Sequence, residues 1–250
     1  MPPLAANEDD PADLSQDFSQ VTRWSLVRKA SEDDTETRLE ALQESCKDYW
    51  PPIYAFLRRD GRSQQDAEDL AQGFFCHLLE SNLLASADRS VGRLRTFLFA
   101  CVKNFLGDEN RQKNTLKRGG HIQFISLNTG SYADDIPDDL TPDMVYQRSW
   151  ALYIINRAVE VTRKQFLKNG EDKLFQALKD RLCEMDQHGD VTQAELANSL
   201  GMTHGAFRTA LFRCRETFRK CLDDEVAQTI SSYDPDEIRE ELRALLESFG

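Results

Sequence analysis

The sequence lacks the features that mark a membrane or secreted protein. Its apolar runs are short and interrupted by charge, so no stretch approaches the roughly 20 residues that cross a bilayer. Residues 1–20 are acidic and have neither the basic start nor the apolar run of a signal peptide. We therefore expect a cytoplasmic protein that does not contact a membrane.

Cysteine and histidine are few and scattered. The six cysteines form no CxxC pair, and the four histidines show no ligand spacing. Most cysteines fall on predicted apolar helix faces, which favours buried thiols. No nucleophile with a base, paired carboxylate site or phosphate-binding loop is evident. We expect no metal, no cofactor and no catalytic activity.

Acidic residues are concentrated at the two ends of the chain. The whole sequence has a net charge of −12, of which residues 1–40 contribute −6 and residues 223–250 contribute −7. The middle part is nearly neutral, and its positive charge lies in two segments, 89–118 and 201–222. The acidic total therefore does not exclude a nucleic-acid partner.

Residues 191–222 predict a helix-turn-helix. Thr192 and Glu195 form the reciprocal pair of a helix start, and Gly201 can end that helix with positive φ. Thr203 then caps a second helix, on which an apolar stripe recurs at spacings of 4, 3 and 4: Phe207, Leu211, Cys214 and Phe218. The opposite side carries His204, Arg208, Thr209, Arg213, Arg215 and Arg219. Such a helix fits the major groove of DNA, and a helical hairpin whose basic residues only aid solubility is the alternative.

Two further helices carry exposed polar residues. Ser63 and Asp66 open a helix that runs to about residue 81, with Asp66, Glu68, Asp69 and Gln72 on or near its exposed side. Exposed acids near a helix N-terminus also simply complement the helix dipole. The segment 89–118 carries eight basic residues against two acids on a long helix, which favours either a phosphate backbone as ligand or a solvated helix end.

The remaining segments complete an all-helical pattern. Pro51 and Pro52 predict the first turn of a helix that ends at Asp60-Gly61. Helices are also expected over 144–168, closed by Asn169-Gly170, and over about 174–185. Between them and the basic helix, residues 119–143 have the composition of a flexible acidic linker.

Four blocks together resemble the bacterial extracytoplasmic-function (ECF) sigma factors. They are YWPPIYAFLRRDG, DAEDLAQGFFCHLLES, GRLRTFLFACVKNFLGDENRQKNTLKR and the helix-turn-helix. The early TRWSLV and the late DEVAQT followed by an acidic helix are similar to the ECF sigma factors abundant in Planctomycetes. The resemblance covers about residues 21–250 and implies two helical domains joined by the linker. The chain then divides into five segments: a disordered acidic N-terminus (1–20), sigma region two (21–118), the linker (119–143), sigma region four (144–222) and an acidic C-terminal extension (223–250).

The resemblance also implies roles for particular residues. Asp69 and Gln72, with Asp66 and Glu68 nearby, would contact the β′ clamp helices of RNA polymerase, and region four would contact the β flap. A further acid commonly follows the glutamine, whereas this chain has Gly73. The loop from Ser86 to Gly92 would capture a flipped base of the minus-ten element. The basic helix beside that loop contributes Lys103, Asn104, Asn110, Arg111 and Lys113, and the minus-thirty-five element would be read by Arg208, Thr209, Phe212 and Arg213, with His204 alongside.

We therefore expect a sigma factor that binds core RNA polymerase and promoter DNA, with an anti-sigma protein as a further possible partner. The alternative is a stand-alone helix-turn-helix regulator or a degenerate sigma-like interaction protein. The DAEDL block favours the first, since a simple repressor has no use for it.

The acidic C-terminal segment predicts an amphipathic helix. Asp234 and Pro235 form its start, and one apolar stripe follows: Ile238, Leu242, Leu245, Leu246 and Phe249. Its outer face is expected to carry Glu237, Glu240, Glu241 and Glu247. Our hypothesis is that this helix docks within the same chain and restrains promoter binding. The alternative is that it completes a hydrophobic core.

Overall fold

The computed structural model describes residues 35–81, 83–86, 93–113, 139–182, 190–230 and 234–249. The predicted disordered segment 1–20 and most of the predicted linker lie outside these ranges. All regular structure in the described ranges is helical, which confirms the all-α prediction. The α-helices are α2 (Thr35–Arg59), α3 (Gln64–Glu80), α4 (Leu94–Lys113), α5 (Pro142–Lys168), α6 (Asp172–Leu178), α7 (Asp190–Ser199), α8 (His204–Ala227) and α9 (Pro235–Leu246). Short 3-10 turns are η2 (Leu83–Ser86), η3 (Lys179–Arg181) and η4 (Glu247–Phe249).

The helices form two hydrophobic cores. The first is built by α2, α3 and α4 together with the first half of α5, the end of α8 and α9. It is rich in aromatic rings: Tyr49 stacks on Trp150 at 4.7 Å, and Phe99 stacks on Tyr146 at 4.3 Å between ring centroids. The second core joins the end of α5 to α6, α7 and most of α8.

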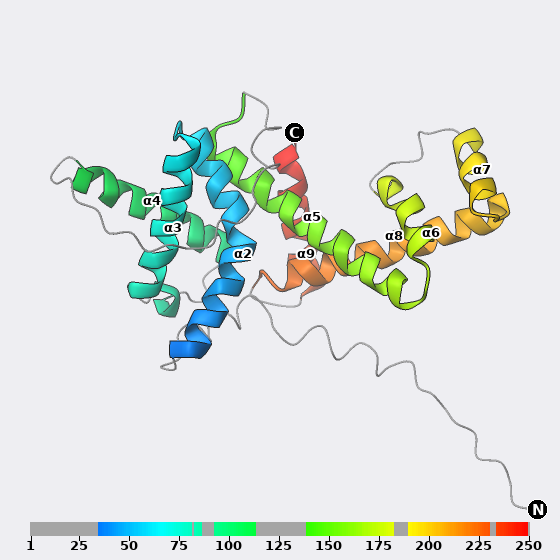
Figure 1. Cartoon of the computed structure of the whole chain (residues 1–250), viewed down its shortest axis with the longest axis horizontal. Helices are drawn as coiled ribbons and strands as arrows, with labels where there is room; N and C mark the ends of the chain where they lie inside the picture. Colours follow the sequence, from blue (N-terminus) through cyan, green and yellow to red (C-terminus); the bar gives the residue numbers. More distant parts are fainter. Residues whose placement is uncertain are drawn as a thin grey trace, which may run out of the picture.

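Helices α5 and α8 belong to both cores and lie side by side between them (Figure 1). Trp150 and Ile154 of α5 are in the first core, whereas Ala158 and Phe166 of the same helix are in the second. Helix α8 returns in the opposite sense, from Phe207 in the second core to Val226 in the first. The change from one core to the other therefore falls within α5, close to Ile154 and Ala158.

Three helices end with the same glycine-dependent turn. Gly61, Gly170 and Gly201 have φ of 88°, 72° and 66°, a region that other residues rarely adopt. At each turn the glycine N–H and the following N–H donate to carbonyls of the last helical turn, as in Met202 N to Ala197 O at 2.9 Å. The expected helix ends at Asp60-Gly61, Asn169-Gly170 and Gly201 are confirmed.

The structure corrects the expected helix starts at the prolines and at Thr192. Pro51 and Pro52 lie inside the continuous helix α2 and do not begin a new one. Burial of Tyr49, Trp50 and Ile53 on either side offsets the backbone hydrogen bonds that the two prolines cannot donate. Helix α7 begins at Asp190, so Thr192 lies within it and is not its cap.

Burial corrects further details. Leu246 of the C-terminal stripe is 60% exposed. Glu241, expected on the outer face, is fully buried. No helix of the described segments is long and apolar enough to cross a membrane.

Candidate nucleic-acid interface

Helices α7 and α8 are joined by a short turn, which is the order of elements expected for the helix-turn-helix. The turn between them holds Gly201 at positive φ, and Thr203 caps α8 by accepting a hydrogen bond from Ala206 N at 3.2 Å. The predicted stripe of Phe207, Leu211, Cys214 and Phe218 is buried in the second core. Burial raises the pKa of the Cys214 thiol to about 11. The stripe fixes which side of α8 faces solvent.

The exposed side of α8 carries the predicted DNA-contacting residues. Arg208, Thr209 and Arg213 are exposed, and the ring of Phe212 is 67% exposed, which is unusual for a large apolar side chain. His204 is half-buried, and its Nε2 atom is buried without a hydrogen-bond partner in the described part of the chain. The structure therefore brings four of the five predicted residues onto one solvent-facing surface, which we call the α8 face: Arg208, Thr209, Phe212 and Arg213.

The arginines of α8 differ in how firmly they are held. Arg213 donates to Glu171 Oε1 at 2.6 Å, and its guanidinium lies 5.5 Å from the centre of the Phe166 ring. Arg215 donates to the Arg181 carbonyl at 3.1 Å, and Arg219 pairs with Glu216. Among the described residues, Arg208 has no ion-pair partner. Arg208 is thus the arginine of the α8 face that can contact a ligand without breaking an internal pair.

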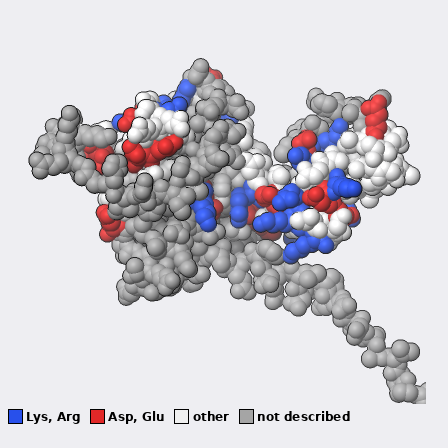
Figure 2. Space-filling view, viewed as in Figure 1, with Lys and Arg blue, Asp and Glu red and all other residues white. Residues whose placement is uncertain are grey.

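Figure 2 shows Lys and Arg side chains over α5 and α8, with acidic side chains among them, and Asp and Glu side chains over α3. All five basic residues of the segment 201–222 lie on α8. An anionic ligand is attracted to the first surface and repelled from the second.

The exposed polar face of α3 is the second candidate surface. Ser63 caps the helix by accepting from Asp66 N at 3.1 Å, as predicted, and Gln64 Nε2 donates to Glu68 at 3.2 Å. Asp66 and Asp69 are exposed, whereas Glu68 and Gln72 are half-buried. The other side of the helix is buried in the first core by Ala67, Leu70, Ala71 and Phe74. The four predicted residues lie together, and we call them the α3 face.

The structure gives a physical reason for Gly73. A Cβ atom at this position would lie 3.3 Å from Cζ of Phe105 on α4, closer than ordinary van der Waals contact. Gly73 therefore permits close packing between α3 and α4. An acid at residue 73 would meet the Phe105 ring, so the polar surface ends at Gln72.

The predicted basic surface of α4 is only partly available. Lys103 pairs with Asp143 at 2.8 Å, and Arg111 pairs with Asp108 at 2.8 Å, both on the surface. Asn104 is exposed, and Asn110 accepts a hydrogen bond from Arg62 at 3.5 Å. The side chain of Lys113 and the loop residues 87–92 lie outside the described residues.

Two arginines of the same basic segment are bound by the C-terminal helix. Arg93 and Arg95 both pair with Glu241 of α9, each at 2.7 Å. Arg95 is only 5% exposed. In this structure the charge of Arg95 at the start of α4 is therefore not free, because a carboxylate of the same chain occupies its guanidinium.

The sequence contained a signal that Glu241 lies on the buried side of its helix. The helical pattern alone did not distinguish this residue from the exposed acids of the same helix. Glu241 lies three residues after Ile238 and four before Leu245, so it shares their side of the helix. A carboxylate on a buried stripe requires a buried cation, and Arg95 supplies it. The partner could not be found from spacing because 146 residues separate the two.

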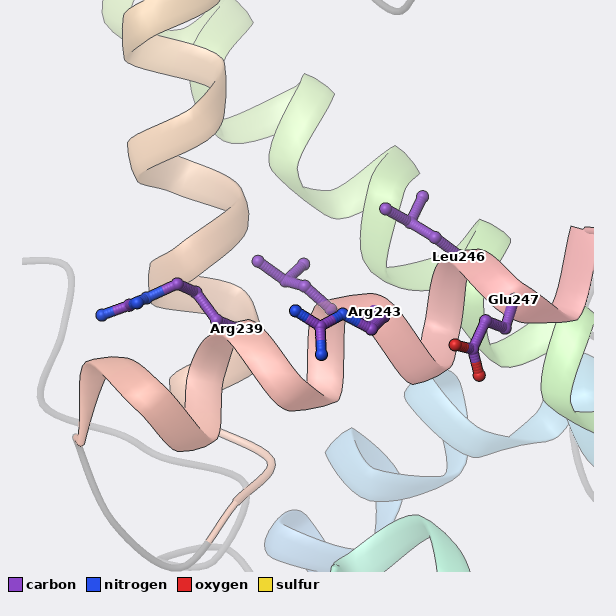
Figure 3. Close-up of a pocket in the computed structure, with 5 residues that line it drawn as sticks. Arg239, Arg243, Leu246 and Glu247 are labelled. Carbon is purple, nitrogen blue, oxygen red and sulfur yellow. The ribbon is translucent and has the colours of Figure 1, made fainter.

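The exposed side of α9 forms a shallow groove of about 520 Å³ lined by Arg239, Leu242, Arg243, Leu246 and Glu247 (Figure 3). Arg239 is already paired with Asp236 at 2.9 Å. Within the described ranges, no three His, Cys, Asp or Glu side chains are arranged to hold a metal ion.

No protein-family model, curated protein or solved structure matches this chain. The geometry of the α8 face and the α3 face is therefore the basis for assigning a function.

Proposed function

We propose that this chain is a dissociable sigma subunit that binds core RNA polymerase and directs it to particular promoters. The observation that carries the proposal is the presence of two separate exposed surfaces on two cores of one chain. The α8 face belongs to the second core, and the α3 face belongs to the first. A DNA-binding surface alone would suit a simple regulator, but it leaves the α3 face without a role.

In this proposal the α8 face reads the minus-thirty-five element. Thr203 and the Gly201 turn set the start of α8, and the buried stripe orients Arg208 and Phe212 outward. An arginine can donate to O6 and N7 of guanine in a bidentate contact, worth about 1 to 3 kcal/mol of discrimination. An apolar ring such as that of Phe212 can contact the methyl group of thymine. The two side chains offer complementary means of reading bases.

The α3 face binds the clamp helices of the β′ subunit in the same proposal. Asp66 and Asp69 are exposed carboxylates on a helix whose opposite side is firmly buried, so they form a rigid acidic surface. Such a surface favours a basic partner and, at low salt, increases the rate of association with it. This role places the protein in the cytoplasm, with polymerase and promoter DNA as partners.

Binding to purified core RNA polymerase tests the proposal. Asp69→Lys reverses a charge on the α3 face without touching the core, and we expect it to weaken polymerase binding by roughly tenfold or more. Glu240→Lys is the matched control, since it makes the same charge change at an exposed position of α9. A folded Asp69→Lys variant that binds polymerase as well as Glu240→Lys would remove the α3 face from the proposal and favour a stand-alone DNA-binding regulator.

A further inference from the structure

The contact between α9 and the start of α4 joins three charged side chains. Nε and Nη2 of Arg95 donate to the two oxygens of Glu241 at 2.7 and 3.2 Å, and Nε of Arg93 lies 2.7 Å from Oε2. The side chain of Glu241 is fully buried, and that of Arg93 is 34% exposed. We call Arg93 and Arg95 the arginine pair. One carboxylate thus accepts two hydrogen bonds from Arg95 and forms an ion pair with Arg93.

The arginine pair is held in place by groups other than Glu241. Nη1 of Arg95 donates to the side-chain oxygen of Gln147 on α5, and the carbonyl of Arg95 accepts from the buried hydroxyl of Tyr146 at 2.9 Å. The carbonyl of Arg93 accepts from Thr96 N and Phe97 N, so Arg93 forms the first turn of α4. The guanidinium of Arg95 is therefore oriented by Gln147 as well as by Glu241, whereas these bonds fix only the backbone of Arg93.

The site that results is suited to an anion in general. Arginine binds carboxylates and phosphates through the same forked arrangement of donors. The N-terminus of α4 adds the favourable end of a helix dipole. Two guanidinium groups, of which that of Arg95 is also held by Gln147, match the charge of a phosphate group at least as well as that of a single carboxylate.

Glu241 reaches this site on a helix that supplies only one buried apolar side chain to the first core. Helix α9 contributes Leu245 to the first core and packs Ile238 and Leu242 against its edge, followed there by Phe249 of η4. The rest of that core is formed by α2, α3, α4, the first half of α5 and the end of α8. A buried ion pair also contributes little net stability, because desolvation offsets the attraction. An incoming anion can therefore compete with Glu241 for the arginine pair.

We propose that the arginine pair is a binding site for a backbone phosphate of nucleic acid, and that Glu241 occupies it in the free protein. Helix α9 then acts as a competitor of the nucleic acid within the chain. The inference rests on the proposed function for its ligand class. It also changes the expected role of the C-terminal helix, because α9 blocks the start of α4 and leaves the α8 face exposed.

Hydrogen exchange of the full-length protein tests the proposal directly. The probe is a single-stranded DNA oligonucleotide of about 12 nucleotides at low salt, where phosphate contacts are strongest. We expect the backbone amides of α9 to lose protection when the oligonucleotide binds. Full protection of α9 at saturating oligonucleotide would overturn the proposal.

Two variants identify the groups responsible. Glu241→Gln removes the competing charge, and we expect it to raise the affinity for the oligonucleotide by about tenfold. Glu240→Gln removes the same charge from an exposed neighbour and should change the affinity by less than about twofold. Equal gains in the two variants would show an effect of net charge only and would contradict the proposal.

If Glu241→Gln fails to fold, a double variant tests whether a phosphate replaces Glu241 at the arginine pair. Arg95→Met combined with Glu241→Met replaces the buried ion pair with apolar side chains of similar size, an exchange that buried pairs often tolerate. We expect α9 to stay protected in this variant when the oligonucleotide is added. Loss of protection equal to that of the wild type would show that the contact between Arg95 and Glu241 plays no part, which would overturn the proposal.

Two outcomes separate this inference from the proposed function. Inorganic phosphate is compared with chloride at the same ionic strength. If phosphate releases α9 and the oligonucleotide has no further effect, nucleic acid is overturned as the ligand. Polymerase binding through the α3 face is measured independently of α9. Suppose that Asp69→Lys loses polymerase binding and that the oligonucleotide leaves the hydrogen-exchange protection of α9 unchanged. This result would support the proposed function and refute the inference.

Discussion

At the scale of single residues, the arginines of α8 are chemically similar but differ in their surroundings. Arg213 is fixed by Glu171 and by the Phe166 ring, whereas Arg208 extends from the same face without an ion pair among the described residues. A new contact of Arg213 with a ligand requires its ion pair with Glu171 to break, and the free energy of that step opposes the contact. Arg208 is therefore expected to contribute more to base recognition.

We predict that Arg208→Ala relaxes base preference at one or two promoter positions. The expected loss of discrimination is about 1 to 3 kcal/mol, the value of one bidentate contact to guanine. Competition binding with single-base variants of the minus-thirty-five DNA measures it. Arg219→Ala is the control, because Arg219 lies further along α8 and pairs with Glu216. A uniform loss of affinity for all sequences from Arg208→Ala would mean that this arginine contacts only phosphate.

The thiol of Cys214 provides a test of packing in the second core. Burial raises its pKa to about 11, so only about one molecule in a thousand carries the thiolate at pH 8. We predict that iodoacetamide modifies the half-buried Cys76 well before Cys214, as measured by mass spectrometry of the folded protein. Modification should become faster as pH rises toward 11. Equal rates for the two cysteines at pH 8 would show that α8 separates readily from α5 and α6.

At the scale of helices, the turn before α8 depends on one glycine. Gly201 has φ of 66°, and a side chain there is strained even though no atom lies within 4 Å of the position that its Cβ would take. Gly205, in the first turn of α8, also has open space but ordinary helical geometry. The same substitution at these two positions should therefore change the free energy of unfolding in opposite directions.

We predict that Gly201→Ala lowers the free energy of unfolding by about 1 to 2 kcal/mol. Gly205→Ala should raise it by about 0.5 to 1 kcal/mol, because alanine has the higher helix propensity and no contact opposes it. Urea denaturation of both variants measures the difference. A Gly201→Ala variant as stable as Gly205→Ala would show that the turn does not need positive φ.

Local patterns predicted most helices because their causes lie within a few residues. The caps at Ser63, Thr203 and Asp234 were all confirmed, since each depends on a side chain and a nearby backbone N–H. The continuity of α2 through Pro51 was missed because it is decided by packing of the flanking aromatic residues against helices far from the prolines in sequence.

The candidate surfaces could likewise be predicted only where the cause lies within one helix. The α8 and α3 faces follow from helical periodicity, which separates buried from exposed sides. The environments of Arg213 and Arg95 depend on Glu171 and Glu241, which lie 42 and 146 residues away. Spacing along one helix carries no information on such partners.

At the scale of the whole molecule, α5 and α8 connect the two cores and α9 packs against the first. The α3 face and the α8 face lie on different cores, and α9 covers neither Arg208 nor Phe212. The α3 face and the α8 face can thus be contacted at the same time, as the proposed binding of polymerase and DNA requires. This arrangement is what a subunit that brings polymerase to a promoter requires.

The most direct test of sigma activity is run-off transcription with purified core polymerase and genomic DNA fragments. We predict transcripts with defined start sites only when the full-length protein is present, and their loss with the folded Asp69→Lys variant but not with Glu240→Lys. Fragments supporting transcription should share an upstream sequence whose recognition is relaxed by Arg208→Ala. Absence of any start site dependent on the protein, under conditions in which it is folded and binds both polymerase and DNA, would contradict the proposal that it is a sigma subunit.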